Sequence, residues 1–289
     1  MHERGPAVVS FNEDGQLPPV VFLHTWNTDV DRLVALADFL GPDQPLYGIE
    51  PPPSDALPAN VAGWLEYDRR LLDTLPVEPP YRLAGFSFGG VVALELARML
   101  QAEKRAVEWI GLVDTLRPKL NPKGVRKYLR YHIEEFLGLP SRPQRRAYAW
   151  RLVRGGAHRN LLRVKNKGIA LLARLHLVRR RPKTLGDERH LLPLKRSIWR
   201  SYLGYEATPY EHPVALFTGA ENRAAAAGDI SLRWSRYLRG GFEVVEIEGE
   251  HLALFLPEHI HSVGGAIRNS LARCQGINST RPKADRLSR

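Results

Sequence analysis

Six short apolar runs, rich in β-branched and aromatic residues, recur along the chain between Gly and Pro residues. Near-continuous apolar runs of this length are typical of strands that are buried on both faces, as in a parallel sheet. The sequence therefore predicts strands at Pro19–Thr25, Pro45–Glu50, Tyr81–Ser87, Trp109–Asp114, Pro213–Gly219 and Phe242–Ile247.

The stretches between these runs have a different period. Their apolar residues recur at three- and four-residue spacing, which indicates amphipathic helices at Asp29–Leu40, Ala59–Leu75, Gly89–Leu100 and Pro257–Arg273. Strands that alternate with helices favour a three-layer α/β fold, in which a mostly parallel sheet is flanked by helices.

The alternation stops between Thr115 and Tyr205, where helical patterns occur without a clear strand. A structureless loop of this length is uncommon in a compact domain, so the segment is predicted to be a helical lid insertion. The predicted organisation is a core of residues 1–114 and 206–274, a lid of residues 115–205, and a polar, disordered tail of residues 275–289.

Charge is unevenly distributed over these parts. The predicted lid contains 24 Lys and Arg residues and four acidic residues, whereas the remainder contains 18 basic and 27 acidic residues. The net charge of +11 thus combines a lid of +20 with a body of −9. This asymmetry favours an anionic partner for the lid, although a charged surface that only maintains solubility is the alternative.

Composition excludes several classes of protein. With Cys274 as the only cysteine, the chain has neither an internal disulfide framework nor a cysteine-built metal site. The first residues lack the apolar stretch of a secretory signal, and no run is long enough to span a membrane. We expect a soluble cytoplasmic protein.

A candidate nucleophile lies in Gly85-Phe86-Ser87-Phe88-Gly89, which matches G-x-S-x-G. The motif follows a predicted strand and opens a predicted helix, which is the context that a nucleophile elbow requires. Ser87 would sit on a sharp turn that projects its hydroxyl above the sheet, and the small glycines leave room for neighbouring backbone.

A serine hydroxyl needs a base, and the base needs an acid that orients it. His251 is the predicted base, because it follows the last strand and precedes the last helix, at the same sheet edge as Ser87. Two residues compete for the acid, Asp114 and Glu221, and both lie at carboxyl ends of strands. Residue patterns alone barely separate these two candidates.

The order and spacing of six runs give a more specific indication. From Val8 to Arg273 the chain resembles the thioesterase domains of non-ribosomal peptide and polyketide synthases, with the lid as the least similar part. The runs that carry the resemblance are PVVFLH, GPDQPLYGIEPP, PYRLAGFSFGGVVALELARML, WIGLVDT, PYEHPVALFTGAE and GEHLALFLPEH.

The resemblance implies the α/β-hydrolase fold with a helical lid, and a Ser-His-Asp acyl-enzyme mechanism in which Asp114 is favoured over Glu221. It implies that the substrate is an acyl, peptidyl or polyketide chain on a phosphopantetheine thioester, carried by an acyl or peptidyl carrier protein or by coenzyme A. No cofactor or metal is expected, because the phosphopantetheine arm belongs to the substrate. We expect a free-standing thioesterase.

The oxyanion would be held by the backbone N–H of Phe88 and by that of Thr25 or Trp26. The family usually has small residues here, so the bulky Trp26 is a departure that bears on the oxyanion site and on acyl entry.

Carrier proteins are typically acidic, which gives the basic lid a role in docking them. An anionic membrane surface is the rival partner, and nucleic acid is not expected because no binding motif occurs. Two other functions remain open: a carboxylesterase, lipase or acyltransferase on the same fold, and a catalytically silent binding protein that uses the basic lid.

Overall fold

The computed structural model describes residues 7–23, 30–117, 191–226 and 228–274. The chain divides into two compact units, of which the first comprises Met1–Pro118 and Pro193–Arg289 and the second comprises Lys119–Leu192. Nearly all of the second unit, which makes up most of the predicted lid, lies outside the described residues, as does the predicted tail. Every described strand belongs to the first unit.

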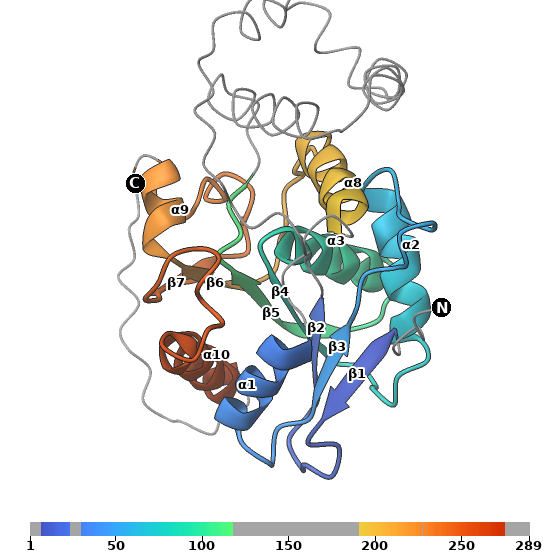
Figure 1. The fold of residues 1–289 in the computed structure, drawn as a ribbon, viewed down its shortest axis with the longest axis vertical. Helices are drawn as coiled ribbons and strands as arrows, with labels where there is room; N and C mark the ends of the chain where they lie inside the picture. Colours follow the sequence, from blue (N-terminus) through green and yellow to red (C-terminus); the bar gives the residue numbers. More distant parts are fainter. Residues whose placement is uncertain (1–6, 24–29, 118–190, 227, 275–289) are drawn as a thin grey trace, which may run out of the picture. The chain divides into compact units, whose positions relative to one another are not determined.

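A seven-stranded sheet, in the order β1-β3-β2-β4-β5-β6-β7, forms the centre of the first unit (Figure 1). Only β1 runs antiparallel to its neighbour, and the other pairs are parallel. This arrangement confirms the predicted α/β class. The strands are β1 Val8–Phe11, β2 Val20–Leu23, β3 Leu46–Ile49, β4 Tyr81–Phe86, β5 Val107–Val113, β6 Val214–Thr218 and β7 Phe242–Glu246.

Burial explains why the apolar runs are continuous. Every residue of β2, β3, β4 and β6 is buried, because helices cover both faces of the sheet. The edge strands β1 and β7 are only partly buried and carry polar side chains. All six predicted strands are present, whereas β1 was not predicted.

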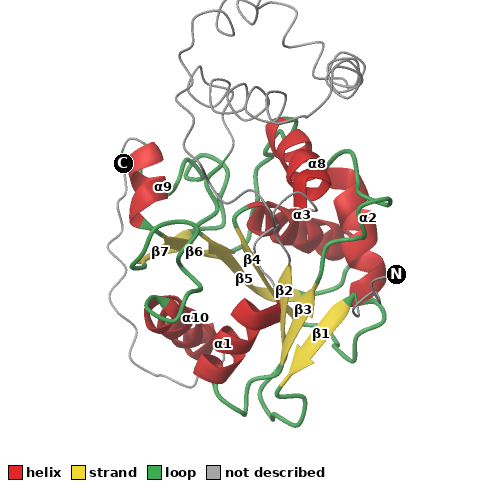
Figure 2. Cartoon of the chain, viewed as in Figure 1, coloured by secondary structure: helices red, strands yellow, loops and turns green. Residues whose placement is uncertain are grey.

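Helices form the two outer layers, which Figure 2 separates by colour from the sheet. On one face, α1 packs against α10, and their apolar side chains form one buried cluster with β2 and β6. On the opposite face, α2, α3 and α8 share a second cluster. The helices are α1 Val30–Leu40, α2 Val61–Leu72, α3 Phe88–Ala102, α8 Leu192–Leu203 and α10 Ile260–Cys274.

Helix α8 lies within the range predicted as lid, yet its residues from Pro193 onward belong to the first unit. The buried Ser201 hydroxyl accepts a hydrogen bond from the indole of Trp64 in α2 at 3.1 Å. The ring of Tyr202 packs edge-on against Phe88 of α3, with ring centroids 6.2 Å apart. Helix α8 thereby covers the start of α3, the helix that follows Ser87.

Candidate active site

Ser87 lies at a sharp turn between β4 and α3. Its φ of 56° and ψ of −115° fall outside the regions that non-glycine residues ordinarily adopt. The turn is tight because Gly85 and Gly89 touch: a Cβ on Gly85 would lie 2.2 Å from the carbonyl carbon of Gly89. A hydrogen bond of 2.9 Å from the Ser87 N–H to the carbonyl of Val113 ties this strained turn to β5.

A second close approach fixes the start of α3. A Cβ on Gly90 would lie 1.9 Å from Oγ1 of Thr115, in the segment that follows β5. The absence of a side chain at Gly90 therefore lets α3 approach the carboxyl end of β5. The turn carrying Ser87 therefore lies close to the end of β5. The missing side chain of Gly90 allows this approach, and the hydrogen bond from Ser87 to Val113 stabilises it.

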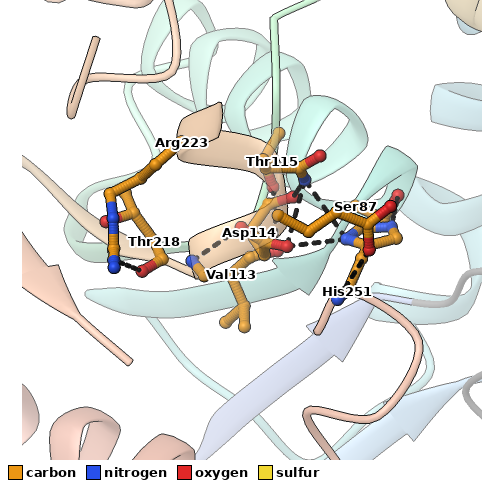
Figure 3. Close-up of polar contacts among 10 residues, drawn as sticks. Ser87, Val113, Asp114, Thr115, Thr218, Arg223 and His251 are labelled. Atoms are coloured by element: carbon orange, nitrogen blue, oxygen red, sulfur yellow. Dashed lines mark hydrogen bonds and ion pairs between the residues drawn. The ribbon is translucent and has the colours of Figure 1, made fainter. Parts of the chain in front are cut away.

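His251 lies beside Ser87, although 164 residues separate the two in the sequence (Figure 3). Its Nε2 lies 3.0 Å from Oγ of Ser87, and its ring rests on Phe86 at a centroid distance of 4.7 Å. The packing against Phe86 limits the orientations that the imidazole ring can take.

Asp114 directly follows β5, with a φ of 45°, and its side chain is completely buried. Its Oδ2 lies 2.7 Å from Nδ1 of His251, while Oδ1 accepts a hydrogen bond of 2.8 Å from the backbone N–H of Gly219. Because a carboxylate only accepts hydrogen bonds, Nδ1 carries the proton and Nε2 has a free lone pair toward Ser87. Ser87, His251 and Asp114 thus form one continuous chain of contacts.

Glu221, the other candidate acid, belongs to the short helix α9, Ala220–Ala225, which follows β6. Its Oε2 accepts a hydrogen bond of 3.1 Å from the backbone N–H of His251 and is not paired with the imidazole nitrogens. The structure therefore places the two candidates differently: Asp114 contacts the ring, and Glu221 contacts the backbone of the same histidine.

Phe88 is the first residue of α3. The first N–H groups of a helix have no partner within the helix, so they are available to an anion. Thr25 and Trp26, the other candidates for holding an oxyanion, lie outside the described residues. Of the three, only Phe88 is placed, directly after Ser87.

Two contacts to Asp114 were not predicted from the sequence. Besides Gly219, the side chain of Asn222 in α9 reaches the Asp114 carboxylate, with Nδ2 at 3.0 Å from Oδ2. A signal was available, because both residues follow β6 and so lie at the sheet edge that carries Asp114. Helix α9 itself has only six residues, too few to show a helical period.

Tyr202 lies near this group of residues. Burial raises the pKa of its hydroxyl well above the ordinary value of 10.0, and the negative charge of Asp114 raises it further. The phenol therefore stays neutral at physiological pH.

In the described part of the chain, His, Cys, Asp and Glu residues do not gather in a group of three that could hold a metal ion. None of the described helices combines the length and the apolar character that a membrane span requires.

Comparison with known proteins gives a family. Residues 35–271 match the family described as "Thioesterase domain". Among curated proteins, the chain is 38% identical over 91 residues to vanchrobactin synthetase VabF from Vibrio anguillarum; these residues are 30% of this chain and 3% of the synthetase. The chain therefore spans only a small part of that relative.

Solved structures share the fold. The NocB thioesterase domain, solved as a covalent complex with a fluorophosphonate nocardicin G analog, superposes with a TM-score of 0.59 at 24% identity, covering 92% of this chain and all of that one. The type II thioesterase BorB from the borrelidin biosynthetic cluster gives a TM-score of 0.57 at 17% identity, covering 93% and 98% of the two chains. These likenesses confirm the predicted α/β-hydrolase fold.

The family match extends over most of the chain and includes the turn at Ser87, the end of β5 and the segment of His251. The resemblance inferred from the sequence is confirmed, and the protein belongs to the thioesterase domain family of serine hydrolases.

Proposed function

We propose that the protein is a serine thioesterase that releases acyl, peptidyl or polyketide chains from a phosphopantetheine thioester. The observation that carries the proposal is the chain of contacts from Ser87 through His251 to Asp114 (Figure 3). In this proposal Ser87 is the nucleophile, His251 the general base and Asp114 the acid that orients the base.

The first step forms an ester on the enzyme. Oγ of Ser87 attacks the thioester carbonyl while Nε2 of His251 takes the hydroxyl proton. The tetrahedral intermediate collapses with cleavage of the C–S bond, and His251 returns the proton to the departing thiolate. Asp114 stabilises the imidazolium that forms between these events, because its buried carboxylate stays 2.7 Å from Nδ1.

The second step regenerates the serine. Water, or a hydroxyl or amine of the bound chain, gives its proton to His251 and attacks the acyl ester, and Ser87 leaves with the proton. The oxyanion of both steps would be held by the backbone N–H of Phe88 and by that of Thr25 or Trp26. Removing one such donor typically raises the barrier by roughly 2.7–4 kcal/mol.

The basic segment of residues 115–205 suits an acidic carrier protein that bears the thioester. On that proposal, added salt lowers kcat/KM for a carrier-bound thioester and leaves the value for a free acyl-pantetheine nearly unchanged. An equal response of both substrates to salt would remove the carrier role from this segment.

The matched comparison of a thioester with an oxygen ester tests the reaction class. Acyl-pantetheine and its oxygen-ester analogue are supplied with the same acyl group, over a series of chain lengths. We expect faster turnover of the thioester, and the length profile defines the acyl preference. Turnover of the oxygen ester alone would make the protein a carboxylesterase, lipase or acyltransferase instead. No turnover, with Ser87 unreactive toward a fluorophosphonate, would leave a binding protein.

A further inference from the structure

Asn222 occupies the junction between the acid and the base of the proposed triad. Its Nδ2 lies 2.9 Å from the backbone carbonyl oxygen of Asp114, 3.0 Å from Oδ2 of Asp114 and 3.2 Å from Nδ1 of His251. The side chain is partly buried, and it belongs to α9, which starts immediately after β6.

The chemistry of the neighbours decides how the amide is oriented. Both Asp114 oxygens near it can only accept hydrogen bonds, so the atom that faces them must be the NH₂ group. That group has two N–H donors, one for the Asp114 carbonyl and one for Oδ2. The approach to Nδ1 of His251 is then not a further hydrogen bond, because the proton on Nδ1 is donated to the same Oδ2.

Oδ2 of Asp114 therefore receives two hydrogen bonds, from His251 and from Asn222, while Oδ1 receives one from the N–H of Gly219. Rotation about the terminal bond of an aspartate side chain is otherwise broad and only weakly restricted. With Oδ1 engaged by Gly219 and Oδ2 by Asn222 and His251, the plane of the carboxylate is fixed, and Oδ2 is directed at the imidazole.

We propose that Asn222 is a positioning residue, which acts through Asp114 to hold the imidazole of His251 in line with Ser87. This inference rests on the proposed function of the triad. It predicts a loss of kcat without a comparable change in KM, because Asn222 contacts the acid and the base and not the nucleophile.

Asn222→Leu tests the proposal, because leucine has a similar volume and no N–H donor. We expect kcat to fall about tenfold or more, since a lost hydrogen bond to a charged group typically has that effect, and KM to stay within about twofold. The matched control is Arg223→Ala in the same helix. Arg223 donates to the carbonyl of Thr218 at 2.6 Å and pairs with Glu246, so this change loosens α9 without touching Asp114 (Figure 3).

A double-mutant cycle separates positioning from simple loss of structure. In an Asp114→Asn background the carboxylate that Asn222 orients is gone, so Asn222→Leu should change the residual rate by less than about twofold. If Asn222→Leu lowers the rate by the same factor in both backgrounds, the proposal is overturned. It is also overturned if Arg223→Ala lowers kcat as much as Asn222→Leu does.

A spectroscopic measurement tests the positioning role of Asn222 without relying on turnover. We expect the proton between Nδ1 of His251 and Asp114 to give a low-field ¹H NMR resonance, and Asp114→Asn assigns this resonance by removing it. We expect Asn222→Leu to shift or broaden this resonance and Arg223→Ala to leave it unchanged. An unchanged resonance in Asn222→Leu would refute positioning. A shifted resonance in an enzyme that hydrolyses no thioester would uphold positioning and refute the proposed reaction.

Discussion

At the scale of the residue, the site depends on which carboxylate contacts the imidazole. Asp114 and Glu221 follow neighbouring strands, and both reach His251. Asp114 contacts the ring and is completely buried, whereas Glu221 accepts a hydrogen bond from the histidine backbone. Glu221 therefore anchors the backbone of the segment that carries His251, and Asp114 is placed to stabilise positive charge on the imidazole ring.

This difference predicts a large loss of kcat for one amide substitution and a small change for the other. Asp114→Asn should lower kcat by roughly 10⁴-fold, because an amide at this position favours the wrong imidazole tautomer. Glu221→Gln should leave kcat within about threefold, because the amide oxygen can still accept the backbone hydrogen bond. Steady-state hydrolysis of one acyl-pantetheine by both variants checks the assignment. A larger loss in Glu221→Gln would exchange the two roles.

The proximity of Ser87, Asp114 and His251 could be predicted from the sequence, because each follows a strand of a parallel sheet and carboxyl ends share an edge. The sequence places Gly219 and Asn222 after β6 at the same edge, but it does not give their contacts with Asp114. They depend on how far α9 begins from β5 in space, which the spacing along the chain does not encode. Thr25 and Trp26 lie outside the described residues, so their role stays a prediction.

At the scale of the element, continuous apolar runs and helical periods were predictable, whereas β1 and α9, which lack such a pattern, were not. The strands β2, β3, β4 and β6 appear as apolar runs because both of their faces are buried. The edge strand β1 has four residues of mixed burial and exists because it pairs with β3. Helix α8 has a clear helical period, but only its packing on Trp64 and Phe88 joins it to the first unit.

Helix packing gives a paired prediction at this scale. A Cβ on Gly264 would lie 2.6 Å from the ring of Phe39 and 3.1 Å from its Cβ, so the ring cannot simply swing away. Gly264→Ala should therefore lower the free energy of unfolding by about 1–3 kcal/mol. At Gly265 the nearest atom would be 3.7 Å away, and Gly265→Ala should raise stability by about 0.5–1 kcal/mol.

Urea denaturation of the two single variants beside the unchanged protein measures both effects. The substitutions are identical and adjacent in α10, so each serves as the control for the other. Equal changes in stability at the two positions would contradict the close approach of α10 to α1 at Gly264.

At the scale of the whole molecule, buried phenols link stability to alkaline pH. Burial is the main cause that raises the pKa of Tyr67 and of Tyr210, each from 10.0 to about 12, and it also raises the pKa values of Tyr202 and Tyr205. In the unfolded chain these groups lose their protons near pH 10, while the folded protein retains them. The contribution of Tyr67 and Tyr210 to stability is therefore complete below pH 10 and is lost as the pH rises from 10 toward 12, and that of Tyr202 and Tyr205 falls over the same range and beyond it.

We expect the urea midpoint to be constant up to about pH 9 and to fall steadily above pH 10. Absorbance at the phenolate band, followed in parallel, should show part of the tyrosines titrating only when the protein unfolds. If all tyrosines titrate near pH 10 in the folded protein, burial does not raise the pKa values of these phenols.

Charge is unevenly distributed over the whole molecule. The basic segment of residues 115–205 and the acidic remainder were evident from the sequence. What the basic segment binds depends on where its charges lie in space, and most of its residues lie outside the described part of the chain. The carrier-docking role therefore stays a proposal that the salt dependence decides.

The proposed function requires that Ser87 forms an acyl-enzyme with a thioester substrate. The most direct measurement is intact-protein mass spectrometry of the enzyme mixed with an acyl-pantetheine and quenched within one turnover. Ser87→Ala is compared with Ser10→Ala, which removes an exposed hydroxyl of the edge strand β1. We expect one acyl adduct on the unchanged protein and on Ser10→Ala, mapped to Ser87, and none on Ser87→Ala. Thioester hydrolysis that persists in Ser87→Ala would contradict the proposed role of Ser87 as the nucleophile.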